Sequence, residues 1–385
     1  MDVIYLDNAA STWPKPSEVK ISMMESIEEY AANPGRGGHQ LAMRASKVIF
    51  RTRAKLAKLF HVLNPNDIVF TSNATGALNQ GIKGLVKPRG HIITTTLEHN
   101  SVRRPIEYLR HTKGVDVSYI APRDLYQLDV LDFEDQIKEN TSLVVVNHAS
   151  NLIGSIAPIK EIGQLCAKYK IPFMVDASQS AGVLPIDVQE MNISLLAFPG
   201  HKGLYGPQGT GGLYIHPDLE LEPLLQGGTG SHSESIDQPT TRPDCYESGT
   251  LNTVGIAGLG AGVDFVLETG IEKIRKKEHA LTIRLMEGLE KIKDVSVHGQ
   301  PKEIERAAVV SFSMSGLDAS EVAFILDQQY GIAVRAGFHC SPLAHETIGT
   351  IQEGAVRASF GYFNENQDVD AIIHALDEIS SELHK

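Results

Sequence analysis

The sequence predicts an α/β protein, in which a mostly parallel sheet is covered by helices on both faces and is followed by a smaller α+β domain. Short runs of β-branched residues alternate with longer amphipathic stretches over roughly the first 260 residues. Beyond that point a long charged helix precedes a more strand-rich pattern. Strands that alternate with helices form parallel sheets, because each connecting helix packs on a face of the sheet.

The elements of the expected parallel sheet can be placed one by one. Helices are predicted over Ala77–Leu85 and Pro158–Tyr169, and the second places its apolar residues on one face. Right-handed crossovers bring the carboxyl ends of the strands to one edge of the sheet. Strands are predicted where apolar or β-branched runs are bounded by turn residues, over residues 67–70, 90–96, 141–146 and 171–175.

The later part of the chain predicts a second domain. We expect a large domain over residues 15–260 and a small α+β domain over residues 261–385, which residues 1–14 join. The helices and strands expected in the small domain lie, in chain order, over residues 268–293, 307–313, 331–335 and 368–383.

The composition narrows the class of protein. A chain of 385 residues that is 42% hydrophobic can bury a sizeable core, and its net charge of −12 argues against nucleic-acid or anionic-membrane surfaces. No apolar run approaches the ~20 residues that span a bilayer, and the N-terminus lacks the regions of a signal peptide. We expect a cytoplasmic protein in a reducing environment, since no CxxC pair or disulfide framework joins its cysteines, Cys166, Cys245 and Cys340.

Four loops that follow strands, or expected strand ends, are rich in small and polar residues. Loops after parallel strands meet at the carboxyl edge of the sheet, where ligands bind in such folds. The sequence therefore predicts a ligand site built from TSNATGA (71–77), TTLEHNS (95–101), NHASNLIG (147–154) and DASQSAG (176–182).

Asp176 and Lys202 are the strongest candidates for chemistry. Asp176 ends a buried apolar run, and Lys202 lies between His201 and a glycine-rich turn. A lysine amine that bonds to an aldehyde and a carboxylate that keeps a pyridine nitrogen protonated are what a pyridoxal 5′-phosphate (PLP) enzyme needs. The alternatives are an aspartate that caps a helix and a solvated surface lysine. Gln179 follows three residues after Asp176, where it can reach the ring oxygen.

Two loops suit a phosphate group. The TSNATGA loop leads into a helix, so Thr75 and the main chain of Ala74 can supply a hydroxyl and free N–H groups. The loop YESGTLNT (246–253) contains Thr250 and is a second small polar loop. Each signal is weak alone, because helix caps use the same residues.

Two histidines are candidates of lower rank. His99 follows a predicted strand, where it can stack on a flat cofactor and relay protons. His39 lies in the glycine-rich NPGRGGH stretch. The alternative for both is a histidine whose nitrogens are satisfied within a loop.

Cys340 and Arg357 suggest the substrate chemistry. Cys340 lies in a loop beside His339, and a nearby histidine or arginine favours the nucleophilic thiolate. Arg357 lies among small and apolar residues and can bind a carboxylate through two hydrogen bonds. Metal binding by Cys340, His339 and His345 is an alternative, but no second ligand pair has convincing spacing, so no metal is expected.

The ordered set of motifs resembles the cysteine desulfurase and selenocysteine lyase family, in the class V aminotransferase branch of the fold-type I PLP enzymes. The resemblance covers essentially the whole chain. It implies a large domain with a mostly parallel seven-stranded sheet, PLP as the cofactor, and a homodimer. The motifs that carry it are LDNAAST (6–12), GHKGLYGPQG (200–209) and GAVRASFGYFN (354–364).

The resemblance also implies a role for each candidate residue. Lys202 would bind PLP covalently, Asp176 would hold the pyridine nitrogen, and His99 would stack on the ring and take part in catalysis. Cys340 would accept sulfur, and RAGFHC around it resembles the branch with a short catalytic loop. The remaining implied contacts are Gln179 and Asn151 near the ring oxygen, Ala74, Thr75 and His201 at the phosphate, Thr250 from the second subunit, and Arg357, Asn151 and His39 at the substrate.

Three positions depart from the family pattern. Pro199 stands where many relatives have a phosphate-binding serine, and Gly203 is an apparent extra residue after the lysine. Phe338 replaces a frequent histidine and makes the entrance near Cys340 more apolar.

The sequence therefore predicts a cysteine desulfurase, which would convert L-cysteine to L-alanine and hold a persulfide on Cys340. The sulfur would pass to a thiol or an acceptor protein, as in iron–sulfur cluster assembly. L-selenocysteine is an alternative substrate. An aminotransferase or elimination enzyme on the same scaffold would need Lys202, Asp176 and Arg357 but not Cys340, and a PLP-binding scaffold protein in sulfur assembly would turn over little.

Overall fold

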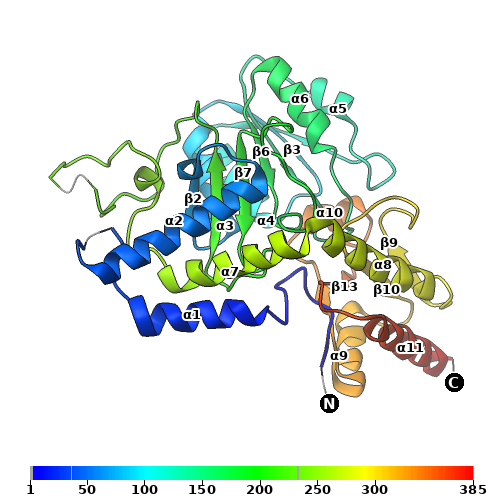
Figure 1. Cartoon of the computed structure of the whole chain (residues 1–385). Coiled ribbons are helices and arrows are strands. Elements are labelled where there is room, and N and C mark those ends of the chain that lie inside the picture. Colours follow the sequence, from blue (N-terminus) through cyan, green and yellow to red (C-terminus); the bar gives the residue numbers. More distant parts are fainter. Residues whose placement is uncertain (1–2, 36, 232–233, 385) are drawn as a thin grey trace.

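The computed structural model describes residues 3–35, 37–231 and 234–384. Within them a seven-stranded sheet forms the centre of the molecule (Figure 1). All neighbouring strands pair in parallel except at β8, which is antiparallel to both of its neighbours. The expected mostly parallel seven-stranded sheet is confirmed. Its order is β2 (Ile68–Thr71), β8 (Gly211–Ile215), β7 (Leu195–Pro199), β6 (Phe173–Asp176), β5 (Thr141–Asn147), β3 (His91–Thr95) and β4 (Asp116–Ile120).

Helices cover both faces of this sheet because its strands are apolar on both sides. Successive side chains of a strand point to opposite faces, and in β5 Val144 and Val146 pack in one core cluster while Leu143 and Val145 pack in another. The first cluster includes apolar residues of α2, α6 and α7, and the second includes those of α3 and α4. The helices of this part are α1 (Ser17–Tyr30), α2 (Gln40–Phe60), α3 (Ala74–Leu85), α4 (Asn100–Lys113), α5 (Val130–Glu134), α6 (Ile159–Tyr169) and α7 (Thr253–Thr269).

The C-terminal part forms a separate four-stranded antiparallel sheet with its own apolar core. The N-terminal strand β1 (Ile4–Tyr5) pairs with β11 (Ile332–Ala333) there, so both ends of the chain lie in this part of the molecule (Figure 1). The sheet order is β12 (Arg335–Gly337), β13 (Ala355–Ser359), β10 (Val309–Met314) and β9 (Val295–His298), with helices α8 (Ile271–Leu289), α9 (Ala319–Tyr330), α10 (Pro342–Thr347) and α11 (Asn366–Leu383).

Two expectations about elements were wrong. The helix expected over residues 268–293 is divided, because α7 ends before Gly270, whose φ of 85° does not continue a helix, and α8 begins after it. The strand expected over residues 331–335 is also divided, since β11 and β12 belong to different sheets. The predicted domain boundary after residue 260 falls inside α7, and the division into two domains at that residue stays a prediction.

No single helix among the described residues is long and apolar enough to cross a membrane. Helices α7 and α8 reach that length and apolar composition only when they are counted together, and they are bent by 84° relative to each other.

The packing of α6 gives a test of the core. A Cβ atom added at Gly163 would lie 1.9 Å from the main-chain oxygen of Met191, and that oxygen belongs to backbone that cannot rotate away. We expect Gly163→Ala to lower the free energy of unfolding by about 1–3 kcal/mol, since the clash outweighs the gain in helix propensity.

Chemical denaturation would measure this loss. The matched control is Gly38→Ala, whose added Cβ would meet nothing within 4 Å. An unchanged midpoint for Gly163→Ala would contradict the close packing of α6 on the Met191 turn.

Candidate functional site

A cavity of about 210 Å³ lies at the carboxyl edge of the large sheet. It collects most of the residues that the sequence singled out, from the loops after β2, β3, β5, β6 and β7 and from β13. The predicted site residues that line the cavity are Ala74, Thr75, His99, Asn151, Asp176, Gln179, His201, Lys202 and Arg357. Further lining residues, which were not among the predicted ones, include Asn73, Ser101, Asn147, Pro199, Arg335 and His339.

Asp176 is the last residue of β6 and is almost fully buried. One carboxylate oxygen accepts a hydrogen bond from the main-chain N–H of Ser178 at 2.9 Å. Burial raises the pKa of Asp176, while this hydrogen bond and the charge of Lys202 lower it. A cation at the open side of the carboxylate would therefore stabilise its ionised form.

Lys202 lies in the turn after β7, and its main chain is held from the N-terminal segment. The Thr12 hydroxyl donates to the carbonyl of Lys202 at 3.0 Å, and the Lys15 ammonium donates to the carbonyl of His201 at 2.7 Å. Burial, and next the positive charge of Arg357, lower the pKa of Lys202 to about 8. The buried amine is therefore neutral in a substantial fraction of molecules near physiological pH.

One end of the cavity suits an anion such as a phosphate group. The N-cap Asn73 accepts from Gly76, and within the described residues the first main-chain N–H groups of α3, at Ala74 and Thr75, have no acceptor. The Thr75 and Ser101 hydroxyls lie 2.8 Å apart. His201 adds a buried Nδ1 that has no partner in the described part of the chain.

Two departures from the family pattern lie beside this end of the cavity. Pro199 ends β7 and lines the cavity without a hydroxyl or an N–H to offer. Gly203 packs so closely that an added Cβ would lie 2.5 Å from the carbonyl oxygen of Ala181. The turn after Lys202 therefore accepts only glycine at this position without rearrangement.

His99 caps α4 and is neutral. Its Nδ1 accepts a hydrogen bond from the main-chain N–H of Ser101 at 3.0 Å. Burial, and then the charge of Lys202, lower the pKa of His99 to about 4. The remaining proton of the neutral ring lies on Nε2, because Nδ1 is an acceptor.

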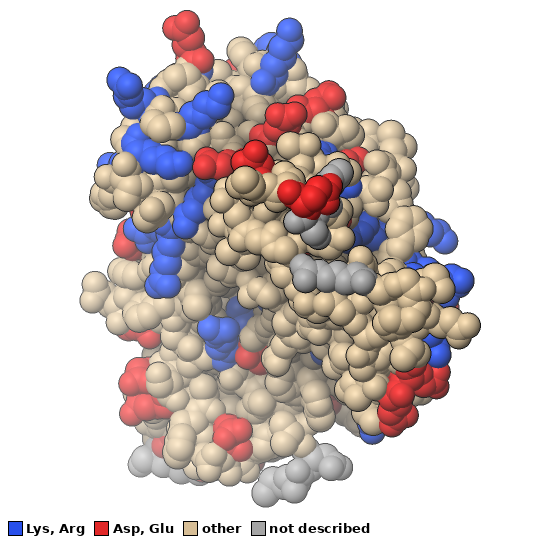
Figure 2. All heavy atoms as spheres, turned by 90° about the vertical axis from the view of Figure 1, so that its left-hand side faces the viewer, with Lys and Arg blue, Asp and Glu red and all other residues tan. Residues whose placement is uncertain are grey.

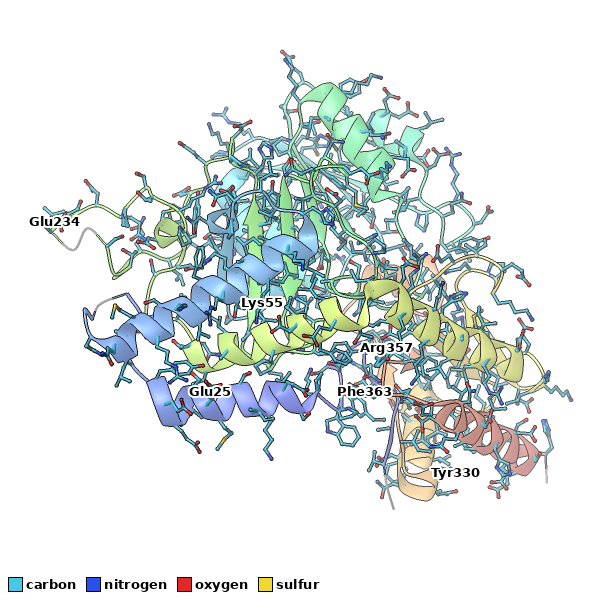
Figure 3. All side chains as sticks on the ribbon, viewed as in Figure 1. Glu25, Lys55, Glu234, Tyr330, Arg357 and Phe363 are labelled. Atoms are coloured by element: carbon cyan, nitrogen blue, oxygen red, sulfur yellow. The ribbon has the colours of Figure 1, made fainter. Side chains whose placement is uncertain are left out.

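Arg357 brings a buried positive charge to the cavity from the centre of β13. Its guanidinium donates to the Asp7 carboxylate at 2.8 Å and to the carbonyl of Asn151 at 2.9 Å, and its Nε has no partner among the described residues. Arg335 is paired with it across the β12–β13 ladder. Figure 3 shows Arg357 where the C-terminal elements approach the rest of the molecule.

Two amide side chains of the cavity are already engaged. Asn151 donates to the carbonyl of His339 at 2.8 Å and accepts from the Ser341 hydroxyl at 2.8 Å, so its side chain holds the turn that carries Cys340. Gln179 donates one N–H to the carbonyl of Ala9 at 3.0 Å and keeps a second N–H.

Cys340 does not line the main cavity but directly follows His339, which does. It occupies a tight turn in which His339 and Cys340 have φ values of 51° and 57°, and its side chain is exposed. The Arg335 guanidinium lies 3.7 Å from its sulfur. The ring of His339 stacks on the ring of His345. Among the described residues, no group of three His, Cys, Asp or Glu side chains could hold a metal ion.

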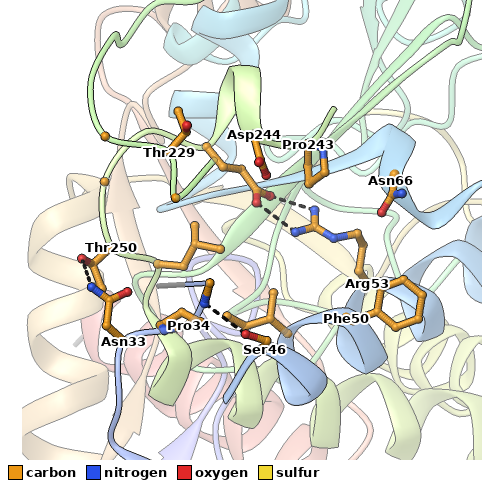
Figure 4. Close-up of a pocket in the computed structure, with 17 residues that line it drawn as sticks. Asn33, Pro34, Ser46, Phe50, Arg53, Asn66, Thr229, Pro243, Asp244 and Thr250 are labelled. Carbon is orange, nitrogen blue, oxygen red and sulfur yellow. Dashed lines mark hydrogen bonds and ion pairs between the residues drawn. The ribbon is translucent and has the colours of Figure 1, made fainter. Parts of the chain in front are cut away.

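Thr250 and His39 lie outside the cavity in a single chain. Thr250 lines another cavity of about 200 Å³, where the Asn33 amide donates to its hydroxyl at 3.4 Å (Figure 4). His39 caps α2 by accepting from the main-chain N–H of Ala42 at 3.3 Å. Neither residue lines the cavity at the carboxyl edge of the sheet.

Sequence reasoning missed several residues of the site. Ser101 lies two residues after His99, and Arg335 lies five residues before Cys340, so the motifs of these two candidates are the signal that could have indicated them. Asp7 lies in the LDNAAST motif and Lys15 shortly after it, but nothing in their local sequence indicated the site, because their contacts there are with residues about 350 and 190 positions away.

Comparison with known proteins places the chain in a family. Residues 4–372 match the model of the family described as Aminotransferase class-V. The chain is 37% identical to a "Probable cysteine desulfurase" of Methanothermobacter thermautotrophicus, over 98% of this chain and 95% of that protein. It is 33% identical to "Cysteine desulfurase IscS" of Clostridium botulinum, over 98% and 94%.

A solved structure agrees with this result. The apo structure of a cysteine desulfurase from Thermococcus onnurineus superposes with a TM-score of 0.92 at 35% identity, over 99% of this chain and 95% of that one. The chain therefore belongs to the aminotransferase class-V family and, within it, to the cysteine desulfurases.

Proposed function

We propose that this chain is a PLP-dependent cysteine desulfurase, which converts L-cysteine to L-alanine and retains the sulfur as a persulfide on Cys340. The observation that carries the proposal is the combination of a buried lysine and a buried aspartate in one cavity with an exposed cysteine at its entrance. Its relatives are named cysteine desulfurases. L-selenocysteine remains a second substrate for the same site.

The residues of the cavity fit PLP. Asp176 would hold the pyridine nitrogen, His99 would lie against the ring, and the second N–H of Gln179 would donate to the ring oxygen. The unpartnered Nδ1 of His201 and the free N–H groups at the start of α3 suit the phosphate. When bound, PLP supplies an electron sink for negative charge at the substrate Cα.

Lys202 has two tasks in this proposal. Its neutral amine would bond to the aldehyde of the cofactor, and, once released by substrate, it would take the proton from the substrate Cα. The low pKa of about 8 makes both tasks feasible near neutral pH. The hydrogen bonds from Thr12 and Lys15 fix the main chain of the turn, so the amine enters the cavity from a defined position.

Arg357 would bind the substrate carboxylate. It is oriented by Asp7 and by the carbonyl of Asn151, and its unpartnered Nε leaves a donor for the ligand. A carboxylate between Arg357 and Arg335 would also offset the repulsion of two neighbouring cations.

Cys340 would act as the nucleophile. Its thiolate attacks the sulfur of the substrate, a new S–S bond forms, and the C–S bond breaks with its electron pair remaining on the carbon side. Protonation there yields alanine. The Arg335 guanidinium lies where it can donate to the thiolate.

A homodimer would give Thr250 its expected place at the phosphate of the partner. Figure 2 views the left-hand side of Figure 1, a face on which Lys, Arg, Asp and Glu side chains are scattered among larger areas of other residues. Exposed apolar residues occur on the neighbouring helices α1 and α2, among them Ile27, Leu41 and Phe50. We also infer a cytoplasmic enzyme that feeds sulfur to iron–sulfur cluster assembly, because all cysteines of the chain are free and one relative carries the name IscS.

Replacing the lysine tests the cofactor assignment. Lys202→Ala should remove the visible absorbance of lysine-bound PLP and reduce alanine formation at least about 10³-fold, since the bonding amine and the base are lost together. Absorbance spectroscopy after PLP addition and borohydride treatment would measure the covalent bond. A PLP adduct on any other lysine of the variant would overturn the assignment.

Replacing the cysteine tests the nucleophile. Cys340→Ala should leave PLP bound and abolish alanine formation from L-cysteine, and mass spectrometry should find the extra sulfur atom only on wild-type Cys340. Cys166→Ala is the control, because Cys166 is buried in the core on α6 and away from the cavity. Alanine production at the wild-type rate by Cys340→Ala would rule out this nucleophile.

The low pKa of Lys202 predicts how apoenzyme takes up PLP. Only the neutral amine attacks the aldehyde, so the rate of covalent capture should rise with pH through about 8 and then level off. Stopped-flow absorbance at saturating PLP would follow the rate. A rise centred near the ordinary lysine value of 10.5 would show that burial does not lower this pKa.

A further inference from the structure

A second depression lies outside the main cavity, between α3 and α4. Its volume is about 400 Å³, which is within the range of small-molecule sites. It shares Thr75, His99 and Ser101 with the main cavity, so the two are continuous. We call it the α3–α4 groove, and its lining is Thr75, Asn79, Lys83, His99, Asn100, Ser101, Arg104, Pro105, Tyr108 and Cys340.

The groove has a defined length. On α3 it is lined by Thr75, Asn79 and Lys83, which are four residues apart and therefore lie along one face of the helix. Eight residues of helix rise about 12 Å, which is the length of roughly three to four residues of extended chain. A molecule about as long as an extended tripeptide would fill it.

The charge of the groove is opposite to that of the whole protein. Its lining contains Lys83 and Arg104 and, among the described residues, no carboxylate, although the chain as a whole has a net charge of −12. The Lys83 ammonium lies 4.6 Å from the centre of the Tyr108 ring, which fixes it at the far end. Arg104 is exposed, and within the described part of the chain no ion pair involves it.

The thiol at the other end cannot move far. The carbonyl of Cys340 accepts from the main-chain N–H of Asn100 at 2.8 Å, and the N–H of Ser341 closes the turn onto the carbonyl of Phe338 at 2.9 Å. Asn151 holds the carbonyl of His339. A sulfur atom on Cys340 must therefore be collected where it is formed, by an acceptor that enters the groove.

We propose that the α3–α4 groove binds the sulfur acceptor, and that this acceptor is a small thiol with one or more carboxylates. This inference rests on the proposed desulfurase function. The carboxylates would lie against Arg104 and Lys83, and the thiolate would reach the persulfide. The acceptor sulfur forms a bond to the outer sulfur atom, the bond between that atom and Cys340 Sγ breaks, and the electron pair returns to Cys340 as thiolate. No external oxidant or reductant is consumed.

Single-turnover transfer is the first test. Holoenzyme would receive one equivalent of L-cysteine, alanine and the Cys340 persulfide would be quantified, and the persulfide would then be chased with mercaptosuccinate, 2-mercaptoethanol or cysteamine. We expect the rate to saturate only with the anionic mercaptosuccinate. Rates would be compared at equal thiolate concentration, because the three thiols differ in pKa.

Substitutions in the groove locate the effect. Arg104→Gln with Lys83→Gln should lower the second-order rate constant for mercaptosuccinate about tenfold and leave 2-mercaptoethanol within about twofold. The control is Arg103→Gln, which removes one positive charge from the residue that precedes Arg104 in α4 and does not line the groove; it is matched to the single variant Arg104→Gln. Alanine formation in the first step should not change in the control.

A second test does not depend on catalysis. Iodoacetate and iodoacetamide alkylate the same thiol, but only iodoacetate is anionic. The ratio of the iodoacetate rate to the iodoacetamide rate at Cys340 of the resting holoenzyme therefore reports the charge of the groove. The ratio should fall severalfold in the double variant and stay constant in Arg103→Gln.

The outcomes separate the two proposals. Absence of alanine or of the Cys340 persulfide would refute the desulfurase function, while the alkylation ratio would still test the groove. An alkylation ratio that is the same in wild type and double variant would overturn the groove proposal. So would equal, unsaturable transfer to all three thiols, which would indicate an acceptor of another class, such as a protein.

Discussion

The site depends on the N-terminal segment from Ile4 to Lys15, which connects the C-terminal sheet to the turn that carries Lys202. At one end β1 pairs with β11, and Asp7 orients Arg357 at 2.8 Å. At the other end Thr12 and Lys15 hold the carbonyls of the lysine turn. The lysine follows a strand of the large sheet and the arginine lies in the C-terminal sheet, so this segment, together with the contact of Arg357 with the carbonyl of Asn151, links their positions. Burial lowers the pKa of Lys15 to about 8, and its close contacts with Thr12 and His201 are made at the cost of desolvating an amine.

The polar groups left without partners in this part of the molecule mark where a ligand belongs. Buried polar atoms are normally hydrogen-bonded, because an unpaired one costs roughly 1–3 kcal/mol. His201 Nδ1 and Arg357 Nε are exceptions among the described residues, and both residues line the main cavity. Two anionic groups would satisfy these atoms. PLP would present its phosphate to His201, and the amino-acid substrate bound to PLP would present its carboxylate to Arg357. His201 and Arg357 therefore each keep one polar atom that a ligand could satisfy, although Arg357 is also held by Asp7 and Asn151.

Much of this site could be predicted from the sequence, because local patterns fix which residues end each strand. The run before Asp176 predicts a buried strand, and parallel strands bring their ends together whatever the loops contain. The contribution of Asp7 and Lys15 could not be predicted in this way, since it depends on hydrogen bonds across about 350 and 190 positions. Gly270 divides a stretch whose charge and apolar pattern are helical on both sides, and only its backbone angle reveals the break. The hydrogen bonds of the Asn151 side chain could not be predicted from the sequence either, because its partners lie in the distant cysteine turn.

Hydrogen bonds hold the cysteine turn on two sides, one facing the main cavity and one facing the α3–α4 groove. Asn151, from the loop after β5, holds it on the side of the main cavity, and the first N–H of α4 holds the carbonyl of Cys340 on the side of the groove. A thiol on a long mobile loop could carry sulfur away from the cavity, but a thiol fixed at both sides cannot. Because the thiol stays in one place, sulfur uptake and sulfur release would differ in which residues surround the reacting sulfur: those of the main cavity or those of the α3–α4 groove. In the proposed mechanism, uptake would occur beside Lys202 and Arg357, and release would occur in the groove, where an anionic acceptor would balance the positive charge of Arg104 and Lys83.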